Sequence, residues 1–420
     1  MSMQTVIIGL GYVGLPLARE ATMAGLNVIG LDVNSGVTSA LNNGRSHIDD
    51  LSDRDINDML KHGFSATTDS RVLAEADVAV ICVPTPLSNE GGPDLRAVVG
   101  AVSMIAENIH KGMLVILEST TYPGTTDEVV RPILEAQGLT AGVDFSLAFS
   151  PERIDPGNSS FGAKNTPKVV GGHTDACTSE AAEFYEQFVD RTVRTKGTRE
   201  AEMAKLLENT YRHVNIALVN EMARFCHDLE IDLWDVIEAA KSKPFGFQAF
   251  YPGPGVGGHC IPIDPNYLSH NVKSRLGYPF RFVELAQEVN SRMPAYVVER
   301  AQDILNAREK ALKGSRVLLL GVTYKPNIAD QRESPAKEVA ERLLAKGSVV
   351  EYHDPFVQDW DAVPTALRTE DLAVGVAGAD LTILLQNHRT YDVASLAERA
   401  ISFFDTRGEV DSDGAGITRL

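Results

Sequence analysis

Three closely spaced glycines directly after a short apolar run constrain the fold of this chain more than any other feature. The run Val6–Ile8 leads into Gly9–Gly14, which reads G-L-G-Y-V-G and fits the pattern G-x-G-x-x-G. In this pattern the first glycine allows a tight turn, the second lets the backbone approach a pyrophosphate, and the third lets a helix pack on a strand. A strand before the glycines and a helix after them are typical of a dinucleotide-binding α/β unit.

An acidic residue at the end of the next apolar run indicates which dinucleotide would bind. Asp32 follows the run Val28–Leu31 and lies 18 residues after Gly14. A carboxylate there can accept a hydrogen bond from the ribose 2′-hydroxyl, and it would repel a 2′-phosphate. The alternative is that the glycines only form a turn. Strand, helix and Asp32 together favour NAD as the cofactor over NADP.

Two arrays of alternating strands and helices are visible along the chain. The first array continues with strand-like runs at 28–31, 78–83, 114–118, 147–150 and 169–171. The second array has such runs at 315–321, 349–353, 381–385 and 401–404. Apolar runs separated by helical patterns are typical of parallel sheets that helices cover on both faces.

The stretch between the arrays is expected to be helical. Residues 198–242 contain no proline and repeat apolar residues at helical spacing, which predicts a long helix and then a shorter one at 233–241. A loop rich in proline and glycine follows at 243–265, and helix returns at 281–308. Residues 411–420 are expected to be frayed. We predict an α/β protein with two Rossmann-like doubly wound domains joined by a central helical region with a long helix, with boundaries at 1–197, 198–308 and 309–420.

Charge and composition exclude several classes of function. The 420 residues include 39 Lys and Arg and 57 Asp and Glu, which gives a net charge of −18. Such a surface repels phosphate backbones and anionic lipids, so we expect no nucleic-acid or membrane partner. No apolar run reaches 18 residues, and the N-terminus lacks the pattern of a signal peptide, so a cytoplasmic protein is expected.

The cysteines are too few and too scattered for a disulfide framework, and none has zinc-ligand spacing, so no metal site is expected. Cys82, Cys177 and Cys226 lie in strand or helix patterns and are interpreted as small packing residues. Cys260 differs, because it lies among glycines and prolines, four residues before Asp264. A thiol in such a loop can be a nucleophile when nearby charge favours the thiolate, although a packing role is the alternative.

A polar stripe on the predicted long helix has two interpretations. Lys205, Asn209 and Arg212 are spaced so that they share one face of the helix. If they are buried, Lys205 and Asn209 could hold an oxyanion or order a water. If the stripe is solvated, Lys205 would pair with Glu202 or Glu208, and spacing alone favours this second interpretation.

Taken together, these motifs resemble the UDP-glucose/GDP-mannose dehydrogenase family, whose members are nucleotide-sugar 6-dehydrogenases. The resemblance covers nearly the whole chain. It rests on the glycine loop and on the segments Val83–Pro86, Glu118–Thr120, Pro123–Thr125, Ser150–Arg153, Lys205–Asn209, Gly257–Cys260, and Lys325 with Asp330–Ser334.

The resemblance implies an activity and a set of partners. It implies a four-electron oxidation of the C6 hydroxymethyl group of a UDP-sugar to a uronate for cell-surface polysaccharide synthesis. Two NAD⁺ would be reduced, and the sugar would pass through a thiohemiacetal and a thioester on Cys260. It also implies a homodimer or higher homo-oligomer, with the dimer contact in the central helical region and the nucleotide on the C-terminal domain.

The resemblance also assigns residues to roles. The implied catalytic residues are Cys260, Lys205, Asn209, Asp264, Glu152 and Thr120. Residues implied near the cofactor are Gly9, Gly11, Tyr12, Val13, Gly14, Asp32, Thr85, Thr120 and Arg332. Residues implied on the substrate side are Glu152, Lys205, Asn209, Arg212, Tyr251, Gly255, Gly257 and Lys325.

Departures from the family pattern bear on the sugar. Ile263 occupies a position where UDP-glucose enzymes tend to carry lysine, and Lys243–Phe247 resembles the UDP-N-acetylhexosamine branch. UDP-N-acetylglucosamine is therefore favoured, with UDP-N-acetylmannosamine and UDP-glucose as alternatives. A hydroxy-acid dehydrogenase would explain the N-terminal part, but neither Cys260 nor the second array. A non-catalytic nucleotide-sugar sensor would be expected to lack the thiol or Lys205.

Overall fold

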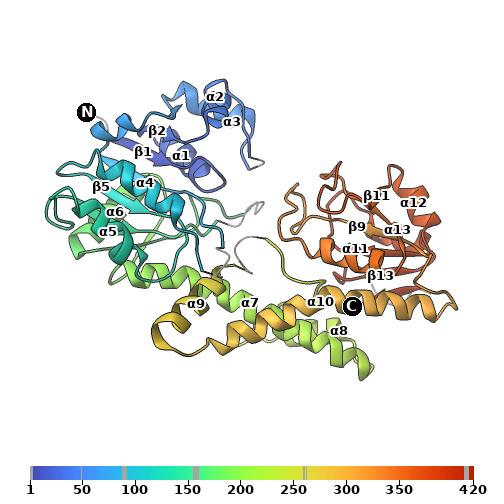
Figure 1. The fold of residues 1–420 in the computed structure, drawn as a ribbon. Coiled ribbons are helices and arrows are strands. Elements are labelled where there is room, and N and C mark those ends of the chain that lie inside the picture. The colour runs from blue at the N-terminus through green and yellow to red at the C-terminus, as the bar shows by residue number, and fades with distance from the viewer. Residues whose placement is uncertain are drawn as a thin grey trace. The chain divides into compact units, whose positions relative to one another are not determined.

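The computed structural model describes residues 3–48, 50–87, 92–154, 160–258, 261, 263–410 and 416–420. The chain forms two compact units, Met1–Glu208 with Asn266–Gly277 and Asn209–Pro265 with Tyr278–Leu420 (Figure 1). Two helices, α7 (Thr198–Asp228) and α9 (Asp264–Leu276), begin in one unit and end in the other. Both units are α/β, which confirms the predicted fold class.

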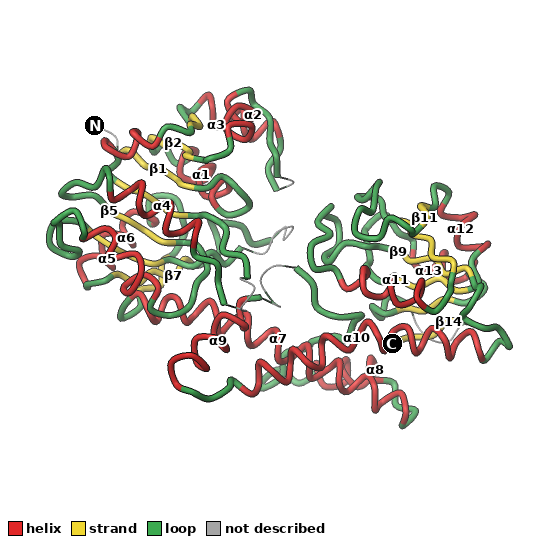
Figure 2. The backbone as a smooth tube through the Cα atoms, in the orientation of Figure 1, coloured by secondary structure: helices red, strands yellow, loops and turns green. Residues whose placement is uncertain are grey.

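An eight-stranded sheet forms the centre of the first unit, in the order β3-β2-β1-β4-β5-β6-β7-β8. Figure 2 shows strands of this sheet in yellow with helices around them in red. Its register places Val6 opposite both Ile29 and Ala79. The strands are β1 (Gln4–Ile8), β2 (Asn27–Leu31), β3 (Ser65–Thr67), β4 (Val78–Ile81), β5 (Leu114–Leu117), β6 (Ser146–Phe149), β7 (Lys168–Gly172) and β8 (Thr192–Arg194).

The two faces of this sheet form two separate cores, because successive strand residues point to opposite sides. Ile7 lies in a core with residues of α1 (Gly14–Met23), α2 (Ser35–Asn42), α3 (Asp53–Lys61) and α6 (Asp175–Tyr185). Val6 and Ile8 lie in a second core with residues of the 3₁₀ helix η1 (Ser70–Glu75), α4 (Arg96–Ala106), the π-helical η2 (Thr126–Val130) and α5 (Arg131–Glu135). The prediction of a doubly covered sheet is therefore confirmed.

The prediction of a wholly parallel first array was wrong at one strand. β7 pairs antiparallel with β6, with Ala148 opposite Gly172. A parallel neighbour requires a crossover of a dozen or more residues, usually a helix. No helix lies between Phe149 and Lys168 in the described residues of that connection. Sequence reasoning also missed β3 and β8, which are short and only partly buried.

A six-stranded parallel sheet forms the centre of the second unit, in the order β11-β10-β9-β12-β13-β14. The strands are β9 (Arg316–Leu320), β10 (Val349–His353), β11 (Leu367–Arg368), β12 (Leu381–Leu384), β13 (Phe403–Asp405) and β14 (Ile417–Arg419). The helices are α8 (Leu233–Lys241), α10 (Arg281–Asn306), α11 (Pro335–Ala345), α12 (Leu372–Gly378) and α13 (Val393–Arg399). The Ser334 hydroxyl accepts a hydrogen bond from Ala336 N, and Pro335 fits the first position of α11.

The expectation of a frayed C-terminus was wrong for the last residues that the structure describes. β14 extends the sheet, and Thr418 lies opposite Phe404 of β13. The indole nitrogen of Trp234 donates a hydrogen bond of 3.0 Å to the carbonyl oxygen of Leu420. This contact comes from α8, far away in the sequence, so the local composition of the terminus does not reveal it. Among the described residues, no helix is long and apolar enough to cross a membrane.

Candidate active site

The glycine loop lies between β1 and α1, as predicted, and its three glycines meet different surroundings. Gly9 has φ +91°, and a Cβ there would lie 2.7 Å from the carbonyl oxygen of Cys82. A Cβ at Gly14 would lie 1.9 Å from the carbonyl oxygen of Gly9. A Cβ at Gly11 would have no atom within 4 Å. Close packing of the protein therefore explains Gly9 and Gly14, whereas Gly11 borders space that a ligand can fill.

Asp32 lies beside this loop at the carboxyl end of β2. Its Oδ2 accepts a hydrogen bond of 3.0 Å from Leu10 N, and its Oδ1 accepts one of 2.8 Å from Asn34 N. Tyr12 is exposed, and Val13 precedes α1 without a side-chain cap. The bare backbone at Gly11 and the carboxylate of Asp32 fit the pyrophosphate and the ribose of NAD.

We expect Asp32→Ser to narrow the preference for NAD⁺ over NADP⁺. In the wild type, kcat/KM with NADP⁺ should be at least about 100-fold lower than with NAD⁺, because the carboxylate of Asp32 and the 2′-phosphate repel each other. The measurement is kcat/KM with each cofactor for both proteins. Equal efficiency of the wild type with NAD⁺ and NADP⁺ would contradict the prediction.

Segments that follow neighbouring strands bring further predicted residues to the same edge of the sheet. The Thr85 hydroxyl, after β4, donates a hydrogen bond of 2.8 Å to the carbonyl oxygen of Thr120, after β5. The Tyr267 hydroxyl of α9 donates to the carbonyl oxygen of Thr85. Glu152 follows β6. The carboxyl ends of parallel strands meet at one edge of a sheet, which is where ligands bind in open α/β sheets.

A buried charged cluster lies next to this edge. The Lys168 ammonium lies 3.0 Å from Glu118 Oε2 and 3.2 Å from Glu152 Oε2. The Tyr185 hydroxyl donates a hydrogen bond to Glu118 Oε1. Burial raises the pKa of Glu118, and burial with the nearby Glu118 raises the pKa of the Cys82 thiol. Cys82 is therefore held as a thiol, which supports its predicted packing role; Cys177 and Cys226 are buried as well.

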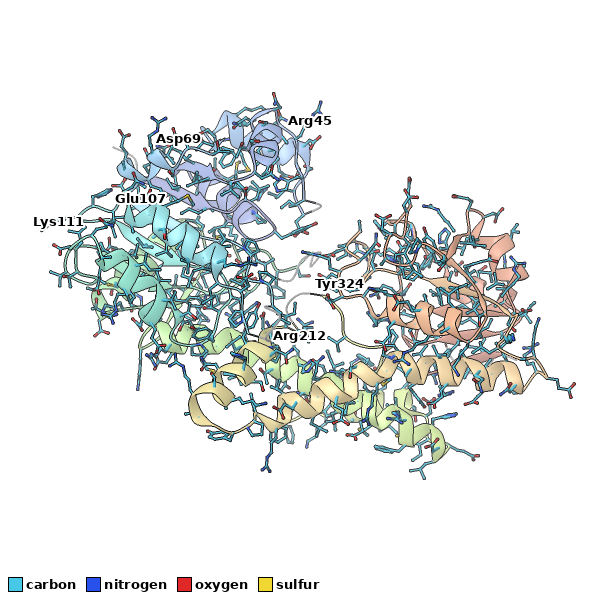
Figure 3. The ribbon with its side chains drawn as sticks, viewed as in Figure 1. Arg45, Asp69, Glu107, Lys111, Arg212 and Tyr324 are labelled. Carbon is cyan, nitrogen blue, oxygen red and sulfur yellow. The ribbon has the colours of Figure 1, made fainter. Side chains whose placement is uncertain are left out.

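On α7 the structure places Lys205 and Asn209 inside the protein. The two residues are 8% and 6% exposed, whereas Arg212 is exposed (Figure 3). The expectation of a solvated stripe, favoured by spacing alone, was therefore wrong for Lys205 and Asn209. The acidic residues that were expected to pair with Lys205 have other partners. Glu202 accepts hydrogen bonds from Gly124 N and Thr126 N, and Glu208 pairs with Arg153.

Asn209 contacts Asp264, which comes four residues after Cys260 in the sequence. Its Nδ2 donates a hydrogen bond of 2.5 Å to Oδ2 of Asp264, and both side chains are buried. Asp264 begins α9, a helix that the sequence reasoning missed because Pro265 was interpreted as the end of the loop. Proline fits the first turn of a helix, where its missing N–H would have no partner. Cys260 lies outside the described residues.

Apart from Asn209 and Arg212 on α7, the substrate-side residues of the second unit lie in loops, as does Arg332, which the resemblance places near the cofactor. The ring of Tyr324 (Figure 3) packs on Gly258, where a Cβ would lie 2.6 Å from a ring carbon. A Cβ at Gly255 or Gly257 would contact Pro335 at 3.0 or 3.1 Å. Tyr251 stacks on Trp234 with ring centres 5.9 Å apart. Lys325 follows β9, and the Arg332 guanidinium lies 2.6 Å from Asp330.

Among the charged residues that sequence reasoning missed, the fold buries Lys168 and Glu202 and partly buries Arg407. Lys168 begins β7, where the sequence suggests only a polar strand end. The side chain of Arg407 donates a hydrogen bond of 2.6 Å to the carbonyl oxygen of Leu385, and burial lowers its pKa to about 10. One guanidinium nitrogen lies 3.2 Å from where a Cβ of Gly253 would stand. For Glu202, the sequence indicates only a surface pairing with Lys205.

Burial raises the pKa of Glu202 to about 7, although Gly124 and Thr126 donate hydrogen bonds to it. Because this value exceeds the ordinary 4.5, the folded state holds a proton that the unfolded state loses, and stability falls as pH rises from about 4.5 to about 7. Glu202→Gln should remove a loss of about 3 kcal/mol across that window. The measurement is urea denaturation at several pH values, with the exposed Glu200→Gln as control. If the free energy of unfolding of Glu202→Gln changed between pH 5 and pH 8 as much as that of the wild type, the prediction would be contradicted.

Three family descriptions match successive parts of the chain. They are the NAD binding domain, the central domain and the UDP binding domain of the UDP-glucose/GDP-mannose dehydrogenase family, at residues 3–189, 199–292 and 318–412. The chain belongs to this family. It is an NAD-dependent nucleotide-sugar dehydrogenase, as the sequence motifs predicted.

The relatives of this dehydrogenase are named for different UDP-sugars. The chain is 36% identical over 392 residues to a UDP-N-acetyl-D-mannosamine dehydrogenase of Pyrococcus horikoshii, covering 92% of this chain and 90% of the relative. A solved structure of the UDP-D-ManNAc dehydrogenase from that organism has a TM-score of 0.88 at 33% identity, covering 99% and 98% of the two chains. A UDP-glucose dehydrogenase from Pyrobaculum islandicum has a TM-score of 0.85 at 29% identity, covering 97% and 94%. The fold therefore does not distinguish the sugars.

Proposed function

We propose that this dehydrogenase oxidises the C6 hydroxymethyl group of UDP-N-acetylmannosamine to the uronate, with reduction of two NAD⁺. This is the four-electron oxidation that the resemblance implied, but the sugar is not the one that the sequence favoured. The sequence favoured UDP-N-acetylglucosamine, whereas the named relatives support its C2 epimer. The match of residues 318–412 to a UDP binding domain supports a UDP-sugar.

The buried hydrogen bond between Asn209 and Asp264 carries the proposal. It links a polar side chain of α7 to the residue four positions after Cys260. Lys205 lies one helical turn before Asn209 and is itself buried. A buried cation and an amide on one face of a helix can stabilise negative charge on the C6 oxygen as it develops, because a water-poor surrounding strengthens these interactions.

When bound, NAD⁺ supplies the hydride acceptor for both oxidations. In the first, Lys205 and Asn209 stabilise the C6 oxygen while the alcohol becomes an aldehyde. The Cys260 thiolate then adds to the aldehyde carbon, a C–S bond forms, the carbonyl oxygen takes up a proton from water, and a thiohemiacetal results. Loss of a second hydride and of the hydroxyl proton gives a thioester. Water attacks that carbon, Glu152 accepts a proton from the water, the C–S bond breaks, and the uronate leaves.

The balance of this reaction is one alcohol, one water and two NAD⁺ converted to one carboxylate, two NADH and three protons. Covalent capture on Cys260 prevents the aldehyde from escaping between the two oxidations. In the second unit, Lys325, Arg332 and Arg407 are the cations that we propose for the diphosphate. An acidic chain of net charge −18 needs such local cations to bind a diphosphate.

We also propose a homodimer that is formed through α7. This helix exposes apolar side chains of the kind that a partner subunit covers, at Met203, Leu207, Tyr211, Leu218 and Phe225. Exposed apolar residues at helical spacing on one element mark an interaction surface. The mass of the protein in solution, measured by light scattering for the wild type and for Leu207→Asp, tests this proposal.

The yield of NADH per sugar tests the function. The panel consists of UDP-N-acetylmannosamine, UDP-N-acetylglucosamine, UDP-glucose and GDP-mannose. We expect two NADH per molecule, with the highest kcat/KM for UDP-N-acetylmannosamine. One NADH per molecule would indicate a simple alcohol dehydrogenase, and none would indicate a sensor. A tenfold higher kcat/KM for another sugar would overturn the assignment of the substrate.

A further inference from the structure

A lysine that the proposed reaction does not use lies in the interior of the first unit. The side chain of Lys168 is only 7% exposed. Its ammonium contacts Glu118 and Glu152 and lies 5.2 Å from the centre of the Tyr185 ring. Removing a charge from water costs several kcal/mol, so a buried ammonium requires partners of this kind. These contacts hold Lys168 in one place and keep it charged.

The carboxylate of Glu152 is held at both of its oxygens. Oε1 accepts hydrogen bonds of 2.6 and 2.5 Å from the backbone nitrogens of Arg153 and Ile154, and Oε2 contacts Lys168. The guanidinium of Arg153 points elsewhere, because it pairs with Glu208 and donates to the carbonyl oxygen of Pro167. Within the described part of the chain, Lys168 is the cationic side chain that pairs with Glu152.

Glu118 competes with Glu152 for the same ammonium. Lys168 has two carboxylate partners, so the three groups carry a net charge of −1 when both acids are ionised. The Tyr185 hydroxyl donates to the other oxygen of Glu118, and the neighbouring Cys82 is held as a neutral thiol. The charge on Glu118 therefore influences how strongly the Lys168 ammonium attracts the carboxylate of Glu152.

We propose that Lys168 is a positioning residue for thioester hydrolysis, which it serves by orienting the carboxylate of Glu152 through its contact with Oε2. Held in that place, Glu152 can accept the proton of the attacking water. Glu118 and Tyr185 act one step further away, by holding Lys168 in place. The inference rests on the role proposed above for Glu152.

The test measures the decay of the thioester at pH 5 to 9. In a single turnover with UDP-N-acetylmannosamine and NAD⁺, intact-protein mass spectrometry follows the uronyl adduct. Lys168→Met should slow the decay about tenfold or more. It should also move the acidic limb of the pH profile, where the decay rate falls as the pH is lowered, up by at least one pH unit. Glu118→Gln should move the limb down, because it removes the competing anion. Lys168→Arg should restore decay to within about threefold of the wild-type rate.

Lys164→Met is the matched control, because Lys164 is exposed four residues before Lys168. It should leave the decay rate and the acidic limb unchanged. A structural defect would not move the limb in opposite directions in Lys168→Met and Glu118→Gln. If Lys168→Met does not fold, the downward shift in Glu118→Gln decides the question. Shifts in the same direction, or no shift, would overturn the inference. Absence of an adduct in every protein, the wild type included, would instead overturn the thioester mechanism.

Discussion

Cys260→Ser is expected to abolish completion of the four-electron oxidation, with uronate formation falling by about 1,000-fold or more. A serine hydroxyl is a poorer nucleophile than a thiolate at neutral pH, and an alkoxide is a poorer leaving group, so an ester would form and hydrolyse slowly. NAD⁺ should still bind, because the glycine loop and Asp32 are unchanged. The measurement is NADH and uronate formed per sugar, with intact-protein mass to detect the adduct.

Lys205→Met separates the two halves of that mechanism. It removes the cation proposed for the C6 oxygen, so the first NADH should form slowly, while the thiol remains able to capture an added aldehyde. Cys82→Ser, a change at a buried packing cysteine, is the matched control for the thiol. If Cys260→Ser formed two NADH and free uronate at the wild-type rate, Cys260 would be a packing residue.

Gly14→Ala is expected to destabilise the first unit by about 3 kcal/mol. The new methyl group would lie 1.9 Å from the carbonyl oxygen of Gly9, which belongs to the backbone and cannot move aside as a side chain can. Either α1 or the loop must shift, and the packing of α1 on the sheet weakens. The midpoint of urea denaturation should fall clearly below that of the wild type.

Gly11→Ala is the matched control in the same loop. A methyl group there meets no protein atom within 4 Å, so stability should stay within about 0.5 kcal/mol of the wild type. Affinity for NAD⁺ should nevertheless fall at least about tenfold, because the methyl group occupies space beside the proposed pyrophosphate. Equal stability losses in the two variants would contradict this division of roles.

Local patterns accounted for much of the fold. The strands β1, β4 and β9 each contain a continuous apolar run, and such runs can be recognised in the sequence because both faces of a parallel sheet are buried. The glycine loop and Asp32 were also recognisable, since their spacing is set within one βαβ unit. The run at 169–171 was recognised as a strand, but the antiparallel direction of β7 was not, because strand direction depends on the course of the connecting segment.

The burial of charged residues was decided by the tertiary structure. Spacing on α7 placed Lys205 and Asn209 on one face, but it did not reveal that other segments cover that face. The partners of Glu202 lie at Gly124 and Thr126, more than 70 residues away. A contact over such a distance leaves no local pattern, so a buried acid and an exposed one look alike in the sequence.

By itself, the sequence determined the α/β class, the dinucleotide loop, the identity of its cofactor through Asp32, and the family through motifs in order. Only the tertiary structure decided which charges are buried and with what partners, as for Lys168 between Glu118 and Glu152. The physical reason is that backbone patterns depend on neighbours along the chain. The cost of burying a charge depends on the groups that the folded chain brings around it.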